Sequence, residues 1–234
     1  MVDGWINIRG NGAGVAGLRS RLKFALIFGV ALFGALYFYF KLGYNLIHIP
    51  AVGDFSIGWL YVPLFVLVVV ATANAVNITD GLDGLSGGLL ASSYAAFGAI
   101  AYFQESYGIA AFCATIVGVM LTYTWFNIYP ARFFMGDSGA FALGTTLGAI
   151  AVLTNAVLVL PIIGLVFVLE AGSSSIQILS KKIFKRKIFL SAPVHHHFEA
   201  KGWPETKVTM RFWVIGQISA VIGLIIGLLG NRAL

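Results

Sequence analysis

The sequence predicts an all-α polytopic membrane protein, and composition, the length of its apolar runs and the placement of its charges all indicate this class. Of its 234 residues, 59% are hydrophobic and 10% are charged, and the mean hydropathy is +0.91. Soluble domains carry about 25% charged residues. Lipid is therefore the solvent that we expect for most of the surface, and the single cysteine, Cys113, leaves no disulfide within the chain.

Seven stretches are candidates for transmembrane spans, since a helical span needs about 20 apolar residues. They lie near residues 23–41, 59–77, 87–103, 108–127, 139–156, 158–179 and 211–230, within one membrane domain over 1–234. The very short gap between the fifth and sixth stretches predicts a tight hairpin. Segment 44–58 predicts a short extracytoplasmic hairpin that turns near Val52-Gly53-Asp54.

The basic residues predict the orientation of these spans. An inside N-terminus and an outside C-terminus place all 15 lysines and arginines except Lys41 and Arg232 on the cytoplasmic side. The segments around Asp80 and Asp137 and the histidine-containing loop 180–210 then also face the cytoplasm. The net charge of +6 is explained by this topology, so we expect membrane lipid as a partner and no nucleic acid. The basic run 181–187 could in addition attract anionic substrates.

A run of polar residues closes the second predicted span. It reads Asn74-Ala-Val-Asn77-Ile-Thr-Asp80-Gly-Leu-Asp83, and helical spacing would place its asparagines and aspartates along one side of a helix end. A polar helix cap followed by a turn is the plainer interpretation. Four such residues in register favour a functional site, because acidic side chains at membrane depth are costly.

A second polar segment separates the fourth and fifth spans. Pro130 ends or bends the fourth span, and Asp137-Ser138 opens the fifth, where either residue could be an ordinary helix N-cap. A second carboxylate on the same membrane face favours a cation site instead, because carboxylates together with substrate phosphates are the usual environment of Mg²⁺.

The third segment contains three adjacent histidines, His195, His196 and His197. Neighbours on a helix point in different directions, so we interpret them as donors to phosphate or proton carriers and not as a zinc site. The alternative is a polar interfacial loop anchored by Trp203. Glu170, which lies inside the sixth predicted span, is interpreted as solvated by the neighbouring serines.

These three segments resemble the motifs of the polyprenyl-phosphate N-acetylhexosamine-1-phosphate transferases. The resemblance covers nearly the whole chain. The matching elements are NxxNxxDGxDGL from Asn74, FMGD ending at Asp137, and HHHFE from His195. The His195–Arg211 segment is similar to the MurNAc-pentapeptide branch of that family. The resemblance implies transfer of phospho-MurNAc-pentapeptide from UDP-MurNAc-pentapeptide to undecaprenyl phosphate, giving lipid I and UMP for peptidoglycan synthesis at the bacterial inner (plasma) membrane.

The resemblance also implies roles for individual residues. Mg²⁺ would be held by Asp137, and the residues implied in catalysis are Asp3, Asp80, Asp83, Asp137 and His196. The residues implied in substrate binding are Lys23, Asn74, Asn77, Gly84, Leu85, Asn127, Phe134, His195 and His197, with Gly84, Leu85 and Phe134 near the uracil. A homodimer is left open.

One motif departs from the family. In the DDxxK-like motif, Asp3 matches the first aspartate, but Gly4 replaces the second and Asn7 replaces the lysine. Family members have about ten spans, and the seven predicted here match the last seven. We therefore expect the first three spans to be absent and turnover by this chain alone to be low. The alternatives are the same chemistry with another UDP-sugar, a non-catalytic membrane partner in wall assembly, or a transporter.

Overall fold

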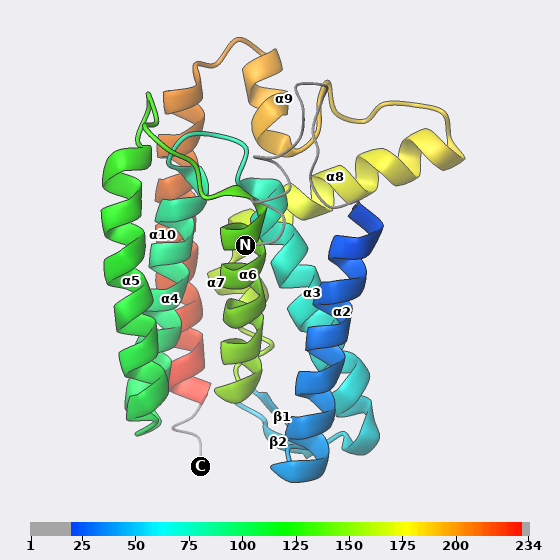
Figure 1. Cartoon of the computed structure of the whole chain (residues 1–234), viewed down its shortest axis with the longest axis vertical. Helices are drawn as coiled ribbons and strands as arrows, with labels where there is room; N and C mark the ends of the chain where they lie inside the picture. The colour runs from blue at the N-terminus through cyan, green and yellow to red at the C-terminus, as the bar shows by residue number, and fades with distance from the viewer. Residues whose placement is uncertain (1–19, 231–234) are drawn as a thin grey trace.

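The computed structural model describes residues 20–230, which form long helices and one short hairpin (Figure 1). Asp3, Gly4 and Asn7 lie outside these residues. In chain order the elements are α2 (Ser20–Leu36), the π-helical turn η1 (Tyr37–Lys41), β1 (Leu46–Ile49), β2 (Gly53–Ser56), the 3-10 turn η2 (Gly58–Leu60), α3 (Tyr61–Thr79), α4 (Leu85–Phe103), α5 (Tyr107–Asn127), α6 (Gly136–Leu153), α7 (Leu160–Ile163), α8 (Leu165–Ile183), α9 (Val194–Ala200) and α10 (Glu205–Gly230).

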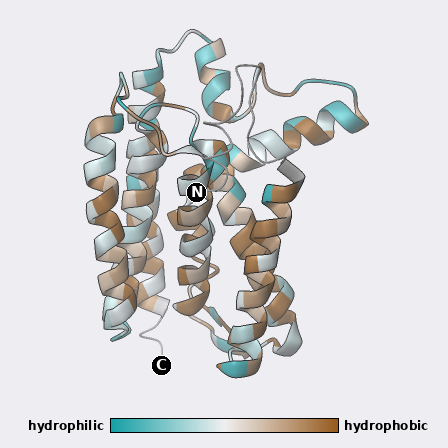
Figure 2. Cartoon of the chain, in the orientation of Figure 1, coloured by the Kyte–Doolittle hydropathy of each residue, from teal (hydrophilic) through white to brown (hydrophobic). Residues whose placement is uncertain are grey.

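Five helices within residues 20–230 are long and apolar enough to cross a membrane. They cover Leu22–Lys41, Gly58–Thr79, Tyr107–Asn127, Gly136–Leu153 and Glu205–Leu229, and they coincide with five of the stretches predicted above. Apolar residues dominate these helices, and hydrophilic residues gather at α9 and at the far end of α8 (Figure 2). The chain is thus an all-α integral membrane protein that crosses the bilayer several times.

Helix α4, over the predicted span 87–103, lies in the interior of the bundle between α5 and α10. Its side chains Leu90, Tyr94, Phe97 and Ile100 are fully buried and form the main core cluster. Small residues allow this close packing. A Cβ on Gly88, for example, would lie 2.3 Å from the ring of Trp213.

The predicted sixth span, 158–179, is divided in the structure. The short α7 ends before Gly164 and α8 begins after it, and α8 extends away from the bundle at a large angle to the other helices (Figure 1). A glycine followed by serines, as at Gly172, favours a bend in a helix, but α8 runs unbroken through these residues. The break falls instead at Gly164, between α7 and α8.

The predicted hairpin is present, but its turn lies at residues 50–52, because Gly53 and Asp54 already belong to β2. Strands β1 and β2 pair antiparallel with Ile49 opposite Gly53. His48 fastens the hairpin to the α6–α7 connection, because its backbone N–H donates to Asn155 Oδ1 at 2.9 Å, and its Nδ1 lies 2.7 Å from Asp54 Oδ1. The hairpin and α9 lie at opposite ends of the bundle (Figure 1).

Candidate active site

Three segments meet at the end of the bundle that lies away from the hairpin: loop 80–84 between α3 and α4, loop 128–135 between α5 and α6, and the region of α9 and the start of α10. Asp83 connects all of them. Its Oδ2 accepts the N–H of Ala131 at 2.9 Å, and its own N–H donates to Glu205 Oε1 at 2.6 Å. The three polar segments singled out in the sequence are therefore brought together by tertiary hydrogen bonds.

Asp83 does not continue the helical register that we predicted for it. Helix α3 ends at Thr79, and Asp80 caps it with an N–H bond to the Val76 carbonyl at 3.2 Å. The chain then turns, and Gly84 takes a φ of +75° at the start of α4, a conformation that favours glycine. The predicted line of four polar residues is thus correct for Asn74 and Asn77 on α3 and wrong for Asp83, which lies in the loop.

Asn127 holds the loops together from a buried position. Its Oδ1 accepts the N–H of Gly84 at 2.9 Å, and its Nδ2 donates to the carbonyl of Phe133 at 2.8 Å. The side chain is 3% exposed. Because both ends of the amide are engaged inside the protein, its structural role is to frame the site.

Asp137 and Asp80 form the acidic centre of the site. Asp137 lies in the first turn of α6, where no side chain caps the helix, so the ordinary N-cap interpretation is not what the structure shows. Its Oδ1 accepts Nδ2 of Asn77 at 3.0 Å, and Lys23 from α2 donates to its Oδ2. Burial, with a further contribution from the negative charge of Asp137, raises the pKa of Asp80 to about 6.

This pair of carboxylates fits a magnesium site that the substrate completes. Within residues 20–230, no group of three or more His, Cys, Asp or Glu side chains could hold a metal ion. Mg²⁺ is, however, usually bound by one or two carboxylates together with substrate phosphates and water. Burial and, to a smaller extent, the charge of Asp137 disfavour the ionised form of Asp80 and raise its pKa, and a bound cation would favour that ionised form.

The three histidines of α9 point to three different partners, as their adjacency predicted. His195 is buried and its Nδ1 lies 2.8 Å from Glu170 Oε2. His196 is partly exposed and its Nδ1 lies 2.6 Å from Glu199 Oε2. His197 Nδ1 accepts the N–H of Leu190 at 3.1 Å. His196 and His197 are thus both partly exposed, whereas His195 is buried, and the side chain of His196 is 44% exposed.

Glu170 is a residue whose role we misinterpreted from sequence. It is fully buried, and it pairs with His195 and not with the serines of α8 through its carboxylate. The ring of His195 in turn packs on loop 80–84, since a Cβ on Gly81 would lie 2.7 Å from His195 Nε2. The sequence did contain a signal for this role, because an acidic residue inside an otherwise apolar stretch is a candidate functional residue.

The remaining predicted residues differ widely in position. Phe134 is 72% exposed beside the site, whereas Leu85 is fully buried in the core. Gly84 is buried, and its carbonyl accepts Nε1 of Trp213 at 3.1 Å. Asn74 lies one turn deeper in α3 than Asn77, and its Nδ2 donates to the Val70 carbonyl at 2.8 Å.

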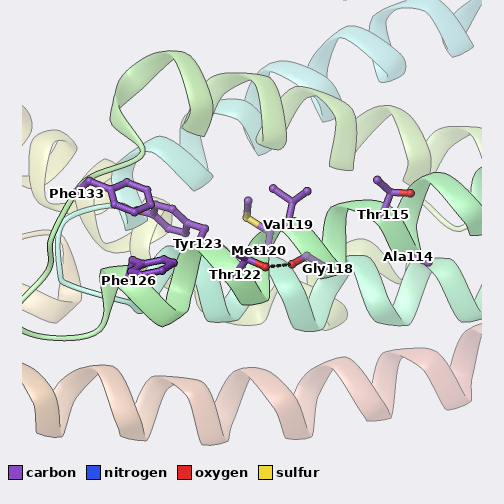
Figure 3. A pocket seen from close by; sticks show the side chains of 9 residues that line it. All are labelled: Ala114, Thr115, Gly118, Val119, Met120, Thr122, Tyr123, Phe126 and Phe133. Carbon is purple, nitrogen blue, oxygen red and sulfur yellow. Dashed lines mark hydrogen bonds between the residues drawn. The ribbon is translucent and has the colours of Figure 1, made fainter.

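Three apolar hollows run along the helices. The first, of about 570 Å³, lies between α4 and α5 and includes Tyr102 and Tyr107, at the end of these helices away from the polar loops. Two others lie nearer the site. One, of about 720 Å³, follows α5 from Ala114 and Gly118 to a cluster of Tyr123, Phe126 and Phe133 (Figure 3). The other, of about 420 Å³, lies between α3 and α8 and includes Ala71, Phe167 and Gly172. Much of the lining of the α3–α8 hollow comes from α3, which ends at Thr79 just before Asp80, and from α8, which carries Glu170.

The sequence model of glycosyl transferase family 4 matches residues 13–155, more than half of the chain. The phospho-N-acetylmuramoyl-pentapeptide-transferase of Chloroflexus aurantiacus (strain ATCC 29366 / DSM 635 / J-10-fl) is 42% identical over 97% of this chain and 66% of that protein. The enzyme of the same name from Geobacillus kaustophilus (strain HTA426) is 43% identical over 90% of this chain and 65% of that protein. The chain thus spans slightly less than two thirds of the length of these curated relatives. The chain therefore belongs to glycosyl transferase family 4.

Proposed function

We propose that this chain carries the site of a phospho-N-acetylmuramoyl-pentapeptide transferase. The reaction moves phospho-MurNAc-pentapeptide from UDP-MurNAc-pentapeptide to undecaprenyl phosphate. An oxygen of the lipid phosphate forms a bond to the phosphorus next to the sugar, the bond from that phosphorus to UMP breaks, and lipid I and UMP result. The proposal depends mainly on one observation: Asn77 and Lys23 both donate hydrogen bonds to the carboxylate of Asp137, which lies near Asp80.

The acidic centre would hold Mg²⁺, with Asp137 as its principal protein ligand. A bound Mg²⁺ supplies charge neutralisation for the diphosphate and helps to align it. Asn77 and Lys23 hold the two oxygens of the Asp137 carboxylate in place. Without a bound cation, burial and the charge of Asp137 raise the pKa of Asp80 to about 6, and a cation at Asp137 would favour the ionised form of Asp80.

His196 would bind the donor from the other side of the site. Glu199 orients its ring through Nδ1, which leaves Nε2 to face a phosphate or a sugar oxygen. His195 and Asn127 support the loops, and His197 holds the backbone at Leu190.

The lipid acceptor would approach sideways through the bilayer along the hollow between α3 and α8. A chain of C₅₅ type cannot leave lipid cheaply, and this hollow is apolar over the length of α8 from Gly164 to Gly172. The nucleotide would enter from the cytoplasm, where the positive-inside rule places the loops of the site. The membrane would be the bacterial inner membrane.

The test is binding and transfer by the detergent-purified 234-residue chain. We expect UDP-MurNAc-pentapeptide to bind in Mg²⁺ and not in EDTA, and UDP-GlcNAc to compete weakly. Transfer to undecaprenyl phosphate, followed as UMP release, should be low and should rise in the variant Gly4→Asp with Asn7→Lys. Equal binding of the two UDP-sugars would favour a related transferase, and no Mg²⁺-dependent uridine nucleotide binding would overturn the proposal.

A further inference from the structure

The basic run 181–187, which begins in the last turn of α8 and continues after the helix, has no part in the site described above. Lys181, Lys182, Lys185, Arg186 and Lys187 are all exposed. Neither Asp nor Glu occurs in the sequence between Glu170 and Glu199, and within residues 20–230 none of the five basic side chains forms an ion pair. Their charge is therefore not neutralised by the described part of the protein.

Buried polar side chains fold this basic segment back over α8. Gln177 is 4% exposed, and its Oε1 accepts the N–H groups of Ile188 at 2.9 Å and Phe189 at 3.1 Å. Its Nε2 donates to the carbonyl of Phe189 at 2.9 Å. Ser180 Oγ donates to the carbonyl of Arg186 at 2.9 Å. Buried hydrogen bonds of this kind hold one defined conformation, so the segment is a built structure and not a loose basic tail.

The fold-back encloses a polar hollow of about 250 Å³. Its polar lining comprises Lys181, Lys187, Ser174, Ser191 and Gln177, and it contains no carboxylate. Two ammonium groups on one hollow repel each other unless an anion lies between them. Two lysines and two hydroxyls offer hydrogen-bond donors from several directions, which suits the oxygens of a phosphate group.

Apolar side chains surround this hollow on the exposed side. Ile178 and Leu190 line it, and they are 68% and 58% exposed. Ile183 and Phe184, at the end of α8, are also exposed, and this end of α8 projects away from the bundle (Figure 1). A ligand with a phosphate for the hollow and hydrocarbon for these side chains matches both features. A membrane phospholipid has that composition, and a free phosphate does not.

We propose that the hollow between α8 and residues 187–192 binds the phosphate of an anionic phospholipid, with the acyl chains against Ile178 and Leu190. The positive-inside rule places this segment at the cytoplasmic surface, where anionic lipids attract clustered lysines. The bound lipid would hold the projecting end of α8, the helix that carries Glu170. This proposal does not depend on the transferase reaction.

Native mass spectrometry of the detergent-purified chain with mixed phosphatidylglycerol and phosphatidylcholine tests it. We expect the parent chain to retain phosphatidylglycerol over phosphatidylcholine by about tenfold, in line with an electrostatic contribution from each lysine near the headgroup. Lys181→Gln with Lys187→Gln should reduce this preference by about fivefold or more. The control, Lys182→Gln with Lys185→Gln, removes the same charge from residues that do not line the hollow and should reduce it by less than about twofold.

A second variant separates geometry from charge. Gln177→Leu keeps all five basic side chains but removes the hydrogen bonds that fold the segment back, so the preference for phosphatidylglycerol should fall as in the lysine pair. Equal losses in the two lysine pairs, together with no loss in Gln177→Leu, would show general charge attraction and overturn the site. Displacement of the lipid by millimolar inorganic phosphate would assign the hollow to a soluble anion and would also overturn it.

Discussion

Glu170 of α8 and His195 of α9 form a buried carboxylate–imidazole pair, with 2.8 Å between Oε2 and Nδ1 and both side chains at most 1% exposed. Glu170 Oε1 and His195 Nε2 are buried as well and have no hydrogen-bond partner among the described residues. The pair joins the helix that lines the α3–α8 hollow to the histidine helix, and the ring of His195 lies against Gly81 in the loop that carries Asp80. Removing either partner therefore leaves a buried polar group alone.

We predict that Glu170→Ala and His195→Ala each lower the stability of the protein by about 3 kcal/mol, because each substitution leaves the other polar side chain buried without a partner. The double variant should lose little more than either single variant. A double-mutant cycle from thermal unfolding in detergent measures this coupling. The matched control is Glu199→Ala beside the partly exposed His196, where we expect about 1 kcal/mol or less. Additive losses in the Glu170 cycle would contradict the pairing.

We predict that Asp137→Asn abolishes the Mg²⁺ dependence of uridine nucleotide binding while the helices remain folded. The amide oxygen can still accept the hydrogen bond from Asn77, but the NH2 group that replaces the second oxygen cannot accept from Lys23, and the charge that a cation requires is lost. Titration calorimetry with UDP-MurNAc-pentapeptide, with and without Mg²⁺, measures the effect, and Asp54→Asn at the hairpin is the control. If the variant retains its Mg²⁺ dependence, Asp137 is not the principal ligand.

The protein should become more stable at neutral pH when Asp80 is replaced by Asn. Burial and the charge of Asp137 raise the folded pKa of Asp80 from 3.8 to about 6, so the folded state binds a proton that the unfolded state has released. Stability from this group is thus fully present below about pH 4 and is lost as the pH rises through about 6. Asp80→Asn should raise the midpoint of thermal unfolding by a few degrees, about 1–2 kcal/mol, at pH 8 and leave it unchanged at pH 4.

That comparison is made in EDTA, so that no divalent cation relieves the repulsion between Asp80 and Asp137. A stabilisation that is the same at pH 4 and pH 8 would show that the charge of Asp80 is not its cause.

The α3–α8 hollow and the α5 hollow can be distinguished as acceptor paths with one substitution in each. Gly172 borders the α3–α8 hollow and Gly118 borders the hollow on α5, and a Cβ at either position meets nothing within 4 Å. Gly172→Leu should weaken the binding of undecaprenyl phosphate by about tenfold or more, since the added side chain fills the hollow, and should leave nucleotide affinity unchanged. Gly118→Leu should change neither. The reverse pattern would move the acceptor path to α5.

The orientation in the membrane is tested by cysteine labelling in a Cys113→Ala background. Val52 in the hairpin turn is 67% exposed, and Lys185, two residues after the end of α8, is also exposed. With an inside N-terminus, a cysteine at residue 52 should react with an impermeant maleimide from outside, and one at residue 185 only after the cells are opened. Labelling of residue 52 from the cytoplasmic side alone would reverse the topology.

Several features were predictable because they depend on short stretches of sequence. Apolar runs of span length, the hairpin around Gly53, and the placement of Asp80, Asp137 and the histidines next to span ends follow from hydropathy and turn chemistry that act over a few residues. The adjacency of His195, His196 and His197 likewise predicts that they diverge, because neighbouring side chains on a helix point apart.

By itself, then, the sequence determined that the solvent is lipid, where most of the long helices lie and which polar residues gather at their ends. The tertiary structure alone decided how those residues are used. The bond from Gly84 to Asn127 joins residues 43 positions apart, and the bond from Asp83 to Glu205 joins residues 122 positions apart. The tertiary structure also decided that the sixth predicted span breaks at Gly164 and that Glu170 pairs with His195. Local periodicity cannot report such contacts, because a buried polar group takes the partner that packing brings to it from a distant part of the chain.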